Sequence, residues 1–323
     1  MPNVLSIQSH VVSGYVGNRA ATFPMQYMGL DVDVINTVQL SNHTGYEKFI
    51  GKVFDSGHIL ELFEGLEYNK IDEYSYLLTG YMGNASNVDA VESIAKKLKK
   101  KNDKLFFLLD TVLGDYGKLY VPKELIALYR EKLVLLADLV TPNQFEAELI
   151  TERKITKLSD AIEACDYFHN LGVPNVIITS SLLEDVSVEG MDNVPLLHMI
   201  GSHMDPVSKT KKAFRISFPN LPGYFTGAGD LFCSLILSRL ATDTNSEESG
   251  SDKLKKCCEL AFASQNNIIE ETMKYQKTTN IPAPLGLDQS GMSSELVKSF
   301  ELKLIANRKY ISDPIVKYQA VDI

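Results

Sequence analysis

The sequence is organised around one stretch, Phe225-Thr226-Gly227-Ala228-Gly229-Asp230-Leu231-Phe232. Apolar side chains continue from it to Leu240 at helical spacing, which predicts a helix over 229–241. The two glycines permit a tight turn and let backbone N–H groups approach a ligand closely. Because a helix N-terminus carries roughly half a positive charge, this turn is predicted to bind an anion.

The aspartate in this turn, Asp230, has two interpretations. In the first, it removes a proton from an alcohol while the amides of Gly227, Ala228 and Gly229 hold a transferring phosphoryl group. In the second, it is an ordinary helix N-cap, a position that aspartate often takes. Gly-x-Gly-Asp is too short to decide between them.

Composition limits the class of protein. The chain has 323 residues, a net charge of −9, 45% hydrophobic and 23% charged residues, which are ordinary values for a soluble globular protein. The acidic balance argues against broad nucleic-acid binding, and no apolar run is long enough to span a membrane. The four cysteines lack metal-ligand spacing, and no signal peptide is recognisable, so reduced thiols in a cytoplasmic protein are expected.

Strand and helix patterns alternate along the chain, which predicts a mostly parallel sheet covered by helices on both faces. We therefore expect one three-layer α/β/α domain over 1–323, with the acidic stretch 242–252 as a surface insertion. Among its helices we expect 122–132 with Pro122 at the first position, one or two helices over 253–277, and one over 294–308. The lysines of the predicted helix 90–101 are interpreted as a solvated face.

Polar residues follow several predicted strands, at the edge where such sheets bind ligands. Asp110, Asp115 and Glu146 are carboxylates of the kind that hold Mg²⁺ together with substrate phosphates, and Asn143 offers an amide to phosphate. An alternative stays open, because Asn-x-x-Glu also fits a helix capping box. Thr179 and Ser180 either contact nucleotide phosphate or satisfy a strand end.

Several motifs together resemble the pyridoxal kinase family. They are Ser6-Ile7-Gln8-Ser9-His10-Val11-Val12, Gly14-Tyr15-Val16-Gly17-Asn18-Arg19-Ala20-Ala21-Thr22-Phe23-Pro24, Ser41-Asn42-His43-Thr44-Gly45-Tyr46, Leu78-Thr79-Gly80-Tyr81, Thr141-Pro142-Asn143-Gln144-Phe145-Glu146-Ala147-Glu148-Leu149 and Gly227-Ala228-Gly229-Asp230. The resemblance runs nearly end to end and fades across 185–220 and after Ala241. The Gly-x-Gly-Asp turn is shared by the whole ribokinase-like superfamily.

The resemblance implies a homodimeric, ribokinase-like, ATP-dependent kinase for the 5′-hydroxymethyl group of pyridoxal, pyridoxine and pyridoxamine. It implies that Asp230 is the general base and that Gly227, Ala228 and Gly229 form the anion hole. The implied B6-binding residues are Ser9, Val16, His43, Thr44 and Tyr81. The implied ATP-binding residues are Asp110, Asn143, Glu146, Thr179, Ser180, Leu221, Pro222, Gly223, Gly227 and Ala228. Asp115 and Glu146 would hold Mg²⁺, and Asp110 with Thr141 would border a monovalent cation such as K⁺.

The sequence departs from the family at three places. Ala228 replaces a common threonine, Thr111 replaces a common proline, and the flap around 115–120 is short. Two other functions are therefore weighed: a kinase for a hydroxymethylpyrimidine, and a non-catalytic B6-binding regulatory protein. Ring selectivity distinguishes the first from a pyridoxal kinase, and loss of turnover would distinguish the second.

Overall fold

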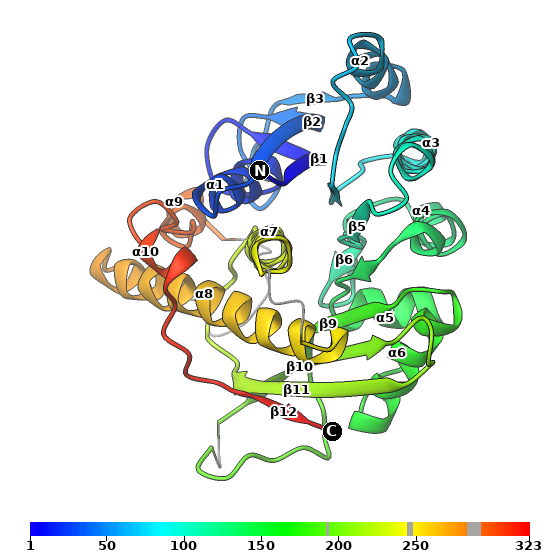
Figure 1. The fold of residues 1–323 in the computed structure, drawn as a ribbon. Helices are drawn as coiled ribbons and strands as arrows, with labels where there is room; N and C mark the ends of the chain where they lie inside the picture. The colour runs from blue at the N-terminus through cyan, green and yellow to red at the C-terminus, as the bar shows by residue number, and fades with distance from the viewer. Residues whose placement is uncertain (192–193, 244–247, 283–291) are drawn as a thin grey trace.

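One ten-stranded sheet runs through the molecule in the order β12-β11-β10-β9-β8-β5-β4-β1-β2-β3 (Figure 1). The computed structural model describes residues 1–191, 194–243, 248–282 and 292–323. The strands are β1 (Asn3–Val11), β2 (Asp31–Leu40), β3 (Gly51–Val53), β4 (Tyr76–Thr79), β5 (Phe106–Leu109), β8 (Leu139–Val140), β9 (Asn175–Ser181), β10 (Leu196–Met204), β11 (Lys211–Pro219) and β12 (Ala320–Asp322). The central strands, from β2 to β9, are all parallel, and the strands outside them pair antiparallel.

Helices cover both faces of the sheet, so the predicted three-layer α/β/α architecture is confirmed. One face packs against α2 (Ser56–Tyr68), α3 (Ala85–Lys101), α4 (Glu124–Leu128), α5 (Gln144–Thr151) and α6 (Leu158–Asn170). The other packs against α1 (Asn18–Tyr27), α7 (Ala228–Thr242), α8 (Gly250–Thr278) and α10 (Lys309–Ser312), and α9 (Ser294–Ser299) lies next to α8.

Helix α7 lies at the centre of its layer, between the sheet, α1 and α8 (Figure 1). Every residue from Leu231 to Ser238 is buried. A helix that is apolar all round belongs in a core, because no face of it can be left in water. The predicted helix 229–241 is therefore confirmed, and its burial fixes the position of the Gly-x-Gly-Asp turn at its start.

Two helix predictions were wrong in part. The helix expected from Pro122 begins two residues later, at Glu124, and changes at Tyr129–Leu133 into a π-helical turn followed by a 3₁₀ turn, Val134–Leu136. The helix expected over 294–308 ends at Ser299. Phe300, Glu301 and Leu302 are all buried in succession, which a surface helix with one buried face cannot achieve.

The region 253–277 is a single helix, α8, and its start at Gly250 falls inside the predicted acidic insertion. Residues 244–247 of that insertion lie outside the described residues. None of the helices that the structure describes is both long and apolar enough to cross a membrane. All four cysteines are buried and free, as the sequence predicted.

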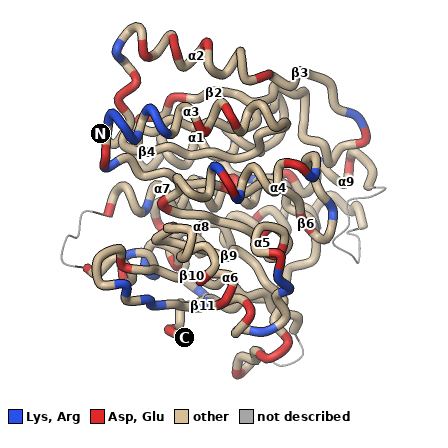
Figure 2. The backbone as a smooth tube through the Cα atoms, turned by 90° about the vertical axis from the view of Figure 1, so that its right-hand side faces the viewer, with Lys and Arg blue, Asp and Glu red and all other residues tan. Residues whose placement is uncertain are grey.

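Acidic and basic residues are interspersed along the backbone (Figure 2). The lysine-rich face of α3 belongs to this pattern: Lys97 pairs with Glu67 at 2.6 Å and Lys101 with Asp72 at 2.7 Å. The interpretation of these lysines as a surface face is confirmed, and their ion pairs fasten α3 to its neighbours.

Candidate active site

A cavity of about 630 Å³ opens at the carboxyl ends of the parallel strands. Its volume is in the range that accommodates small-molecule ligands, and its position is where open α/β sheets bind them. The predicted site residues that line it are Ser9, Val16, His43, Thr44, Tyr81, Asp110, Asp115, Thr141, Asn143, Glu146, Thr179, Ser180, Leu221, Gly223, Gly227, Ala228, Gly229 and Asp230. Pro222 is exposed and is not among the lining residues, so its expected contact with the nucleotide is not supported.

The anion turn is built on a left-handed glycine. Gly227 is the N-cap of α7, with φ 85°. A Cβ atom at this position would lie 1.9 Å from the carbonyl oxygen of Tyr15, so only glycine allows the turn to approach this strand-end loop. The N-terminus of α7 consequently forms part of the cavity wall, where an anion is favoured.

Asp230 is the third residue of α7, so the interpretation of this residue as an N-cap is wrong. Burial raises the pKa of its carboxyl, and the backbone N–H of Gly17, which donates to it, lowers the pKa in part. A carboxylate whose pKa is raised towards neutrality is a better proton acceptor than a solvated aspartate. The geometry therefore favours the general-base interpretation.

Asn143 and Glu146 form the capping box that the sequence left as an alternative. The Asn143 side-chain oxygen accepts from the Glu146 backbone at 2.9 Å, and the Glu146 carboxylate accepts from the Asn143 backbone at 3.0 Å. Glu146 also accepts from the backbone N–H of Leu113 at 2.9 Å. The Asn143 amide also donates to the Gly114 carbonyl at 2.8 Å, so the cap fixes both side chains in the cavity wall.

The carboxylates in the cavity lack basic partners. Burial, with the neighbouring charges of Glu146 and Asp230, raises the pKa of Asp110 well above its usual range. Burial also raises the pKa of Glu146 to about 8 and that of Asp115 to about 6. Among the described residues that line the cavity, none is lysine or arginine.

This donor set fits a bound cation. An added positive charge would offset the cost of burying these carboxylates together. The described residues contain no preformed group of three or more His, Cys, Asp or Glu side chains that could hold a metal ion.

The short flap still covers the cavity. Strands β6 (Gly114–Asp115) and β7 (Lys118–Leu119) form a hairpin, and Tyr116 and Tyr120 from it line the cavity. The Tyr120 hydroxyl contacts that of Tyr224, across the cavity mouth. Tyr120 lies in the flap that the sequence indicated around 115–120, whereas Tyr224 was missed.

Two further contributions were missed. Gln265 and Asn266, from the middle of α8, line the cavity, and the Gln265 amide donates to the Ala228 carbonyl at 2.7 Å. Consecutive amides inside a long apolar helix were a usable signal. Glu301 contacts His43 from the C-terminal segment, and no local pattern marks it.

The fold and the site together define a small-molecule kinase of the ribokinase-like class. The family model of phosphomethylpyrimidine kinase matches residues 79–253, more than half of the chain. Two curated relatives extend the match to nearly the full length. The pyridoxal kinase of Ovis aries is 38% identical over 98% of this chain and 97% of its own, and that of Arabidopsis thaliana is 40% identical over 98% and 93%.

A solved structure agrees with these relatives. Pyridoxal kinase from Leishmania donovani in complex with ADP and pyridoxamine superposes with a TM-score of 0.84, at 31% identity, over the whole of both chains. The chain belongs to the pyridoxal kinase family. The resemblance found in the motifs is thereby confirmed, and the kinase relatives count against a non-catalytic protein.

Proposed function

We propose that this protein transfers the γ-phosphoryl group of ATP to the 5′-hydroxymethyl group of pyridoxal, and likewise of pyridoxine and pyridoxamine. The observation that carries the proposal is the position of Asp230. Its half-buried carboxylate lies in the first turn of α7, in the same cavity as the strand-end residues expected to bind a vitamin B6 ring and a nucleotide.

The Asp230 carboxylate takes the proton of the substrate hydroxyl as the oxygen attacks the γ-phosphorus, and ADP leaves. The turn Gly227-Ala228-Gly229, at the N-terminus of α7, faces the transferring group, and the positive end of the helix neutralises the developing charge. Within this turn the Ala228 N–H donates to the Phe225 carbonyl at 3.1 Å. Phosphoryl transfer needs positioning and charge neutralisation more than covalent help. Alanine at position 228 removes a hydroxyl donor but leaves the backbone donors intact.

The carboxylates Asp110, Asp115 and Glu146 are proposed to face Mg²⁺ bound with ATP, and Asp110 and Thr141 a monovalent cation such as K⁺. When bound, the cations neutralise phosphate charge. The support for these roles is the cluster of buried carboxylates with raised pKa values and no basic side chain in the described cavity lining.

The remaining roles follow the two ends of the cavity. We assign the B6 ring to the end formed by Ser9, Val16, His43, Thr44 and Tyr81. The nucleotide is assigned to the end formed by Asn143, Thr179, Ser180, Leu221 and Gly223. We also propose that residues 1–323 act as one kinase domain, in the cytoplasm and as a homodimer.

Formation of pyridoxal 5′-phosphate by the purified protein, with Mg-ATP and pyridoxal, tests the proposal. Asp230→Asn keeps the shape of the side chain but removes the base, so kcat should fall by roughly 10²–10⁴. Near-normal turnover by the variant would exclude Asp230 as the base. Absence of product from the wild-type protein would refute the proposed substrate.

A hydroxymethylpyrimidine is the second candidate substrate, because the phosphomethylpyrimidine kinase model matches the chain. It belongs in the same assay as an alternative acceptor. Turnover of the pyrimidine alone would keep the fold, the base and the anion hole, and would transfer the proposal to a different ring.

A further inference from the structure

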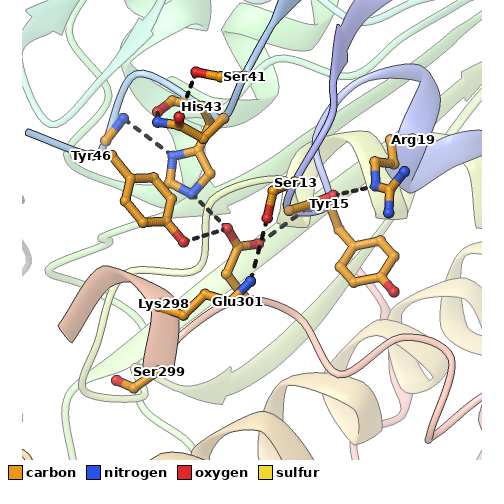
Figure 3. A network of polar contacts seen from close by, with 12 residues as sticks. Ser13, Tyr15, Arg19, Ser41, His43, Tyr46, Lys298, Ser299 and Glu301 are labelled. Carbon is orange, nitrogen blue, oxygen red and sulfur yellow. Dashed lines mark hydrogen bonds and ion pairs between the residues drawn. The ribbon is translucent and has the colours of Figure 1, made fainter. Parts of the chain in front are cut away.

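The Glu301 carboxylate lies at the centre of a polar network between three segments that are far apart in the sequence (Figure 3). It follows α9 and is buried. One of its oxygens accepts from the Tyr46 hydroxyl at 2.9 Å and lies 3.3 Å from His43 Nε2. The other accepts from the Tyr15 backbone N–H at 3.2 Å.

The tautomer of His43 follows from its second contact. The backbone N–H of Gly45 donates to His43 Nδ1 at 3.2 Å, so Nδ1 is an acceptor and the ring proton is on Nε2. His43 therefore donates to Glu301 through Nε2. The His43 and Tyr46 rings pack with their centroids 4.8 Å apart, which makes the loop that carries them one unit.

Glu301 stays ionised in this environment. Burial alone would raise the pKa of its carboxyl, but the hydrogen bond and charge attraction from His43, the hydrogen bond from Tyr46 and the charge of Lys298 together outweigh burial and lower the pKa. This contrasts with the carboxylates in the cavity, whose pKa values are raised. Glu301 is thus a satisfied structural anion.

The network contacts both the residues on the alcohol-substrate side of the cavity and the loop next to the anion hole. His43, Thr44 and Gly45 line the cavity on the side assigned to the alcohol substrate. Tyr15, held through its N–H by Glu301, places its carbonyl against the anion-hole glycine, Gly227, with no room for a Cβ atom between them.

We propose that Glu301 is a positioning residue that fastens the substrate loop, residues 41–46, to the turn at 13–16, and thereby sets the affinity for the alcohol substrate. The inference rests on the proposed function, since that function makes this loop part of the substrate site. Glu301 does not line the cavity, so it acts through His43 and Tyr15.

Glu301→Gln tests the role with little change in shape. An amide has only one accepting oxygen, so its NH₂ group must face at least one of the three donors, and at least one bond is lost. We expect KM for pyridoxal to rise by about 10-fold, the usual net worth of one to two hydrogen bonds, and KM for ATP to stay within about twofold.

Glu295→Gln is the matched control, because it removes the same charge from an exposed position on α9. Tyr46→Phe removes one donor from the network and should raise KM for pyridoxal less, about threefold. Combined with Glu301→Gln it should add less than threefold, because both changes act on the same hydrogen-bond network.

Amide hydrogen exchange gives a readout that does not need turnover. Exchange over residues 12–16 and 41–46 should be faster in Glu301→Gln than in wild type or Glu295→Gln. Two outcomes would overturn the proposal: unchanged exchange in both segments, or a fall in kcat with both KM values unchanged, which indicates a structural role only.

Failure of the proposed function is recognised separately, in the wild-type protein. If wild type phosphorylates a hydroxymethylpyrimidine instead, KM for that acceptor replaces KM for pyridoxal. If wild type binds pyridoxal without turnover, the dissociation constant from calorimetry replaces it. In each case the ratio between Glu301→Gln and Glu295→Gln still decides the positioning role.

Discussion

Gly17→Ala should inactivate the enzyme without unfolding it. Gly17 has φ 52° and lies where three parts of the site meet. A Cβ atom on it would lie 2.1 Å from the carbonyl oxygen of Ser9, whereas real Cβ atoms essentially never come closer than 3.0 Å to another heavy atom. Its N–H also donates to Asp230. The substitution must therefore move backbone by about 1 Å at the point where the base is held.

The magnitude follows from that displacement. A misplacement of about 1 Å at reacting groups costs on the order of 10²-fold in rate. The forbidden backbone conformation costs roughly 1–3 kcal/mol of stability. A protein with a typical stability of about 5–15 kcal/mol stays folded after such a loss, so inactivation cannot be explained by unfolding.

Gly29→Ala is the matched control. Gly29 also has a positive φ, of 88°, in the turn between α1 and β2, but a Cβ atom there would meet nothing within 4 Å. It should lose about 1–2 kcal/mol of stability and no activity. We would measure kcat/KM for pyridoxal and urea unfolding for both variants. Equal kcat/KM values would refute the argument that the Gly17 contact holds the base.

Two further predictions concern stability and the lid. Burial, together with nearby Arg215, lowers the pKa of His198 to about 4. Between pH 6.5 and pH 4 the unfolded chain therefore binds a proton that the folded chain excludes. Because of this, the free energy of unfolding falls as the pH drops. His198→Asn keeps a polar group beside Ser217. Between pH 7 and pH 5, the free energy of unfolding measured in urea should fall by about 2 kcal/mol less in this variant than in wild type. Equal decreases in the two proteins would contradict the lowered pKa of His198. Tyr120→Phe removes the hydroxyl contact with Tyr224 at the cavity mouth. Water that enters the site can then hydrolyse ATP, so the ratio of ADP released to phosphorylated product should rise up to several-fold. Tyr224→Phe should give the same change. An unchanged ratio in both would show that the contact does not close the site.

The part of the site that could be predicted from the sequence lies at strand ends. Short apolar runs such as 105–109 mark buried parallel strands, and the residue after such a run must face the ligand edge of the sheet. Asp110 was placed by this argument alone, before any resemblance was used, whereas Thr141 entered only through the resemblance. The anion turn was equally visible, because a helix that is apolar all round must be central, and its start carries the glycines.

The remaining parts depend on contacts that no local pattern records. Glu301 meets Tyr46 across 255 positions and Tyr15 across 286, and its own neighbours gave only a helix prediction that was wrong beyond Ser299. The helix failed there because Phe300 and Glu301 turn inward to different partners. Pairing over such distances is set by how the sheet and its two helical layers pack.

The electrostatic contrast between two kinds of buried carboxylate indicates which groups act on ligands. Asp110, Glu146 and Asp230 are held in the cavity with raised pKa values and no basic side chain among the described lining residues. Glu301 is buried nearby with a lowered pKa, because the effects of His43, Tyr46 and Lys298 outweigh burial, whereas the backbone hydrogen bonds to Glu146 and Asp230 do not. A folded chain keeps the first arrangement only if ligands offset its cost, which cations, phosphate and a substrate proton would do in a kinase. Glu301 needs no ligand to offset its burial, because the protein already stabilises its charge. For this reason we assign Glu301 to positioning, and Asp110, Glu146 and Asp230 to direct contact with the reacting groups or cations.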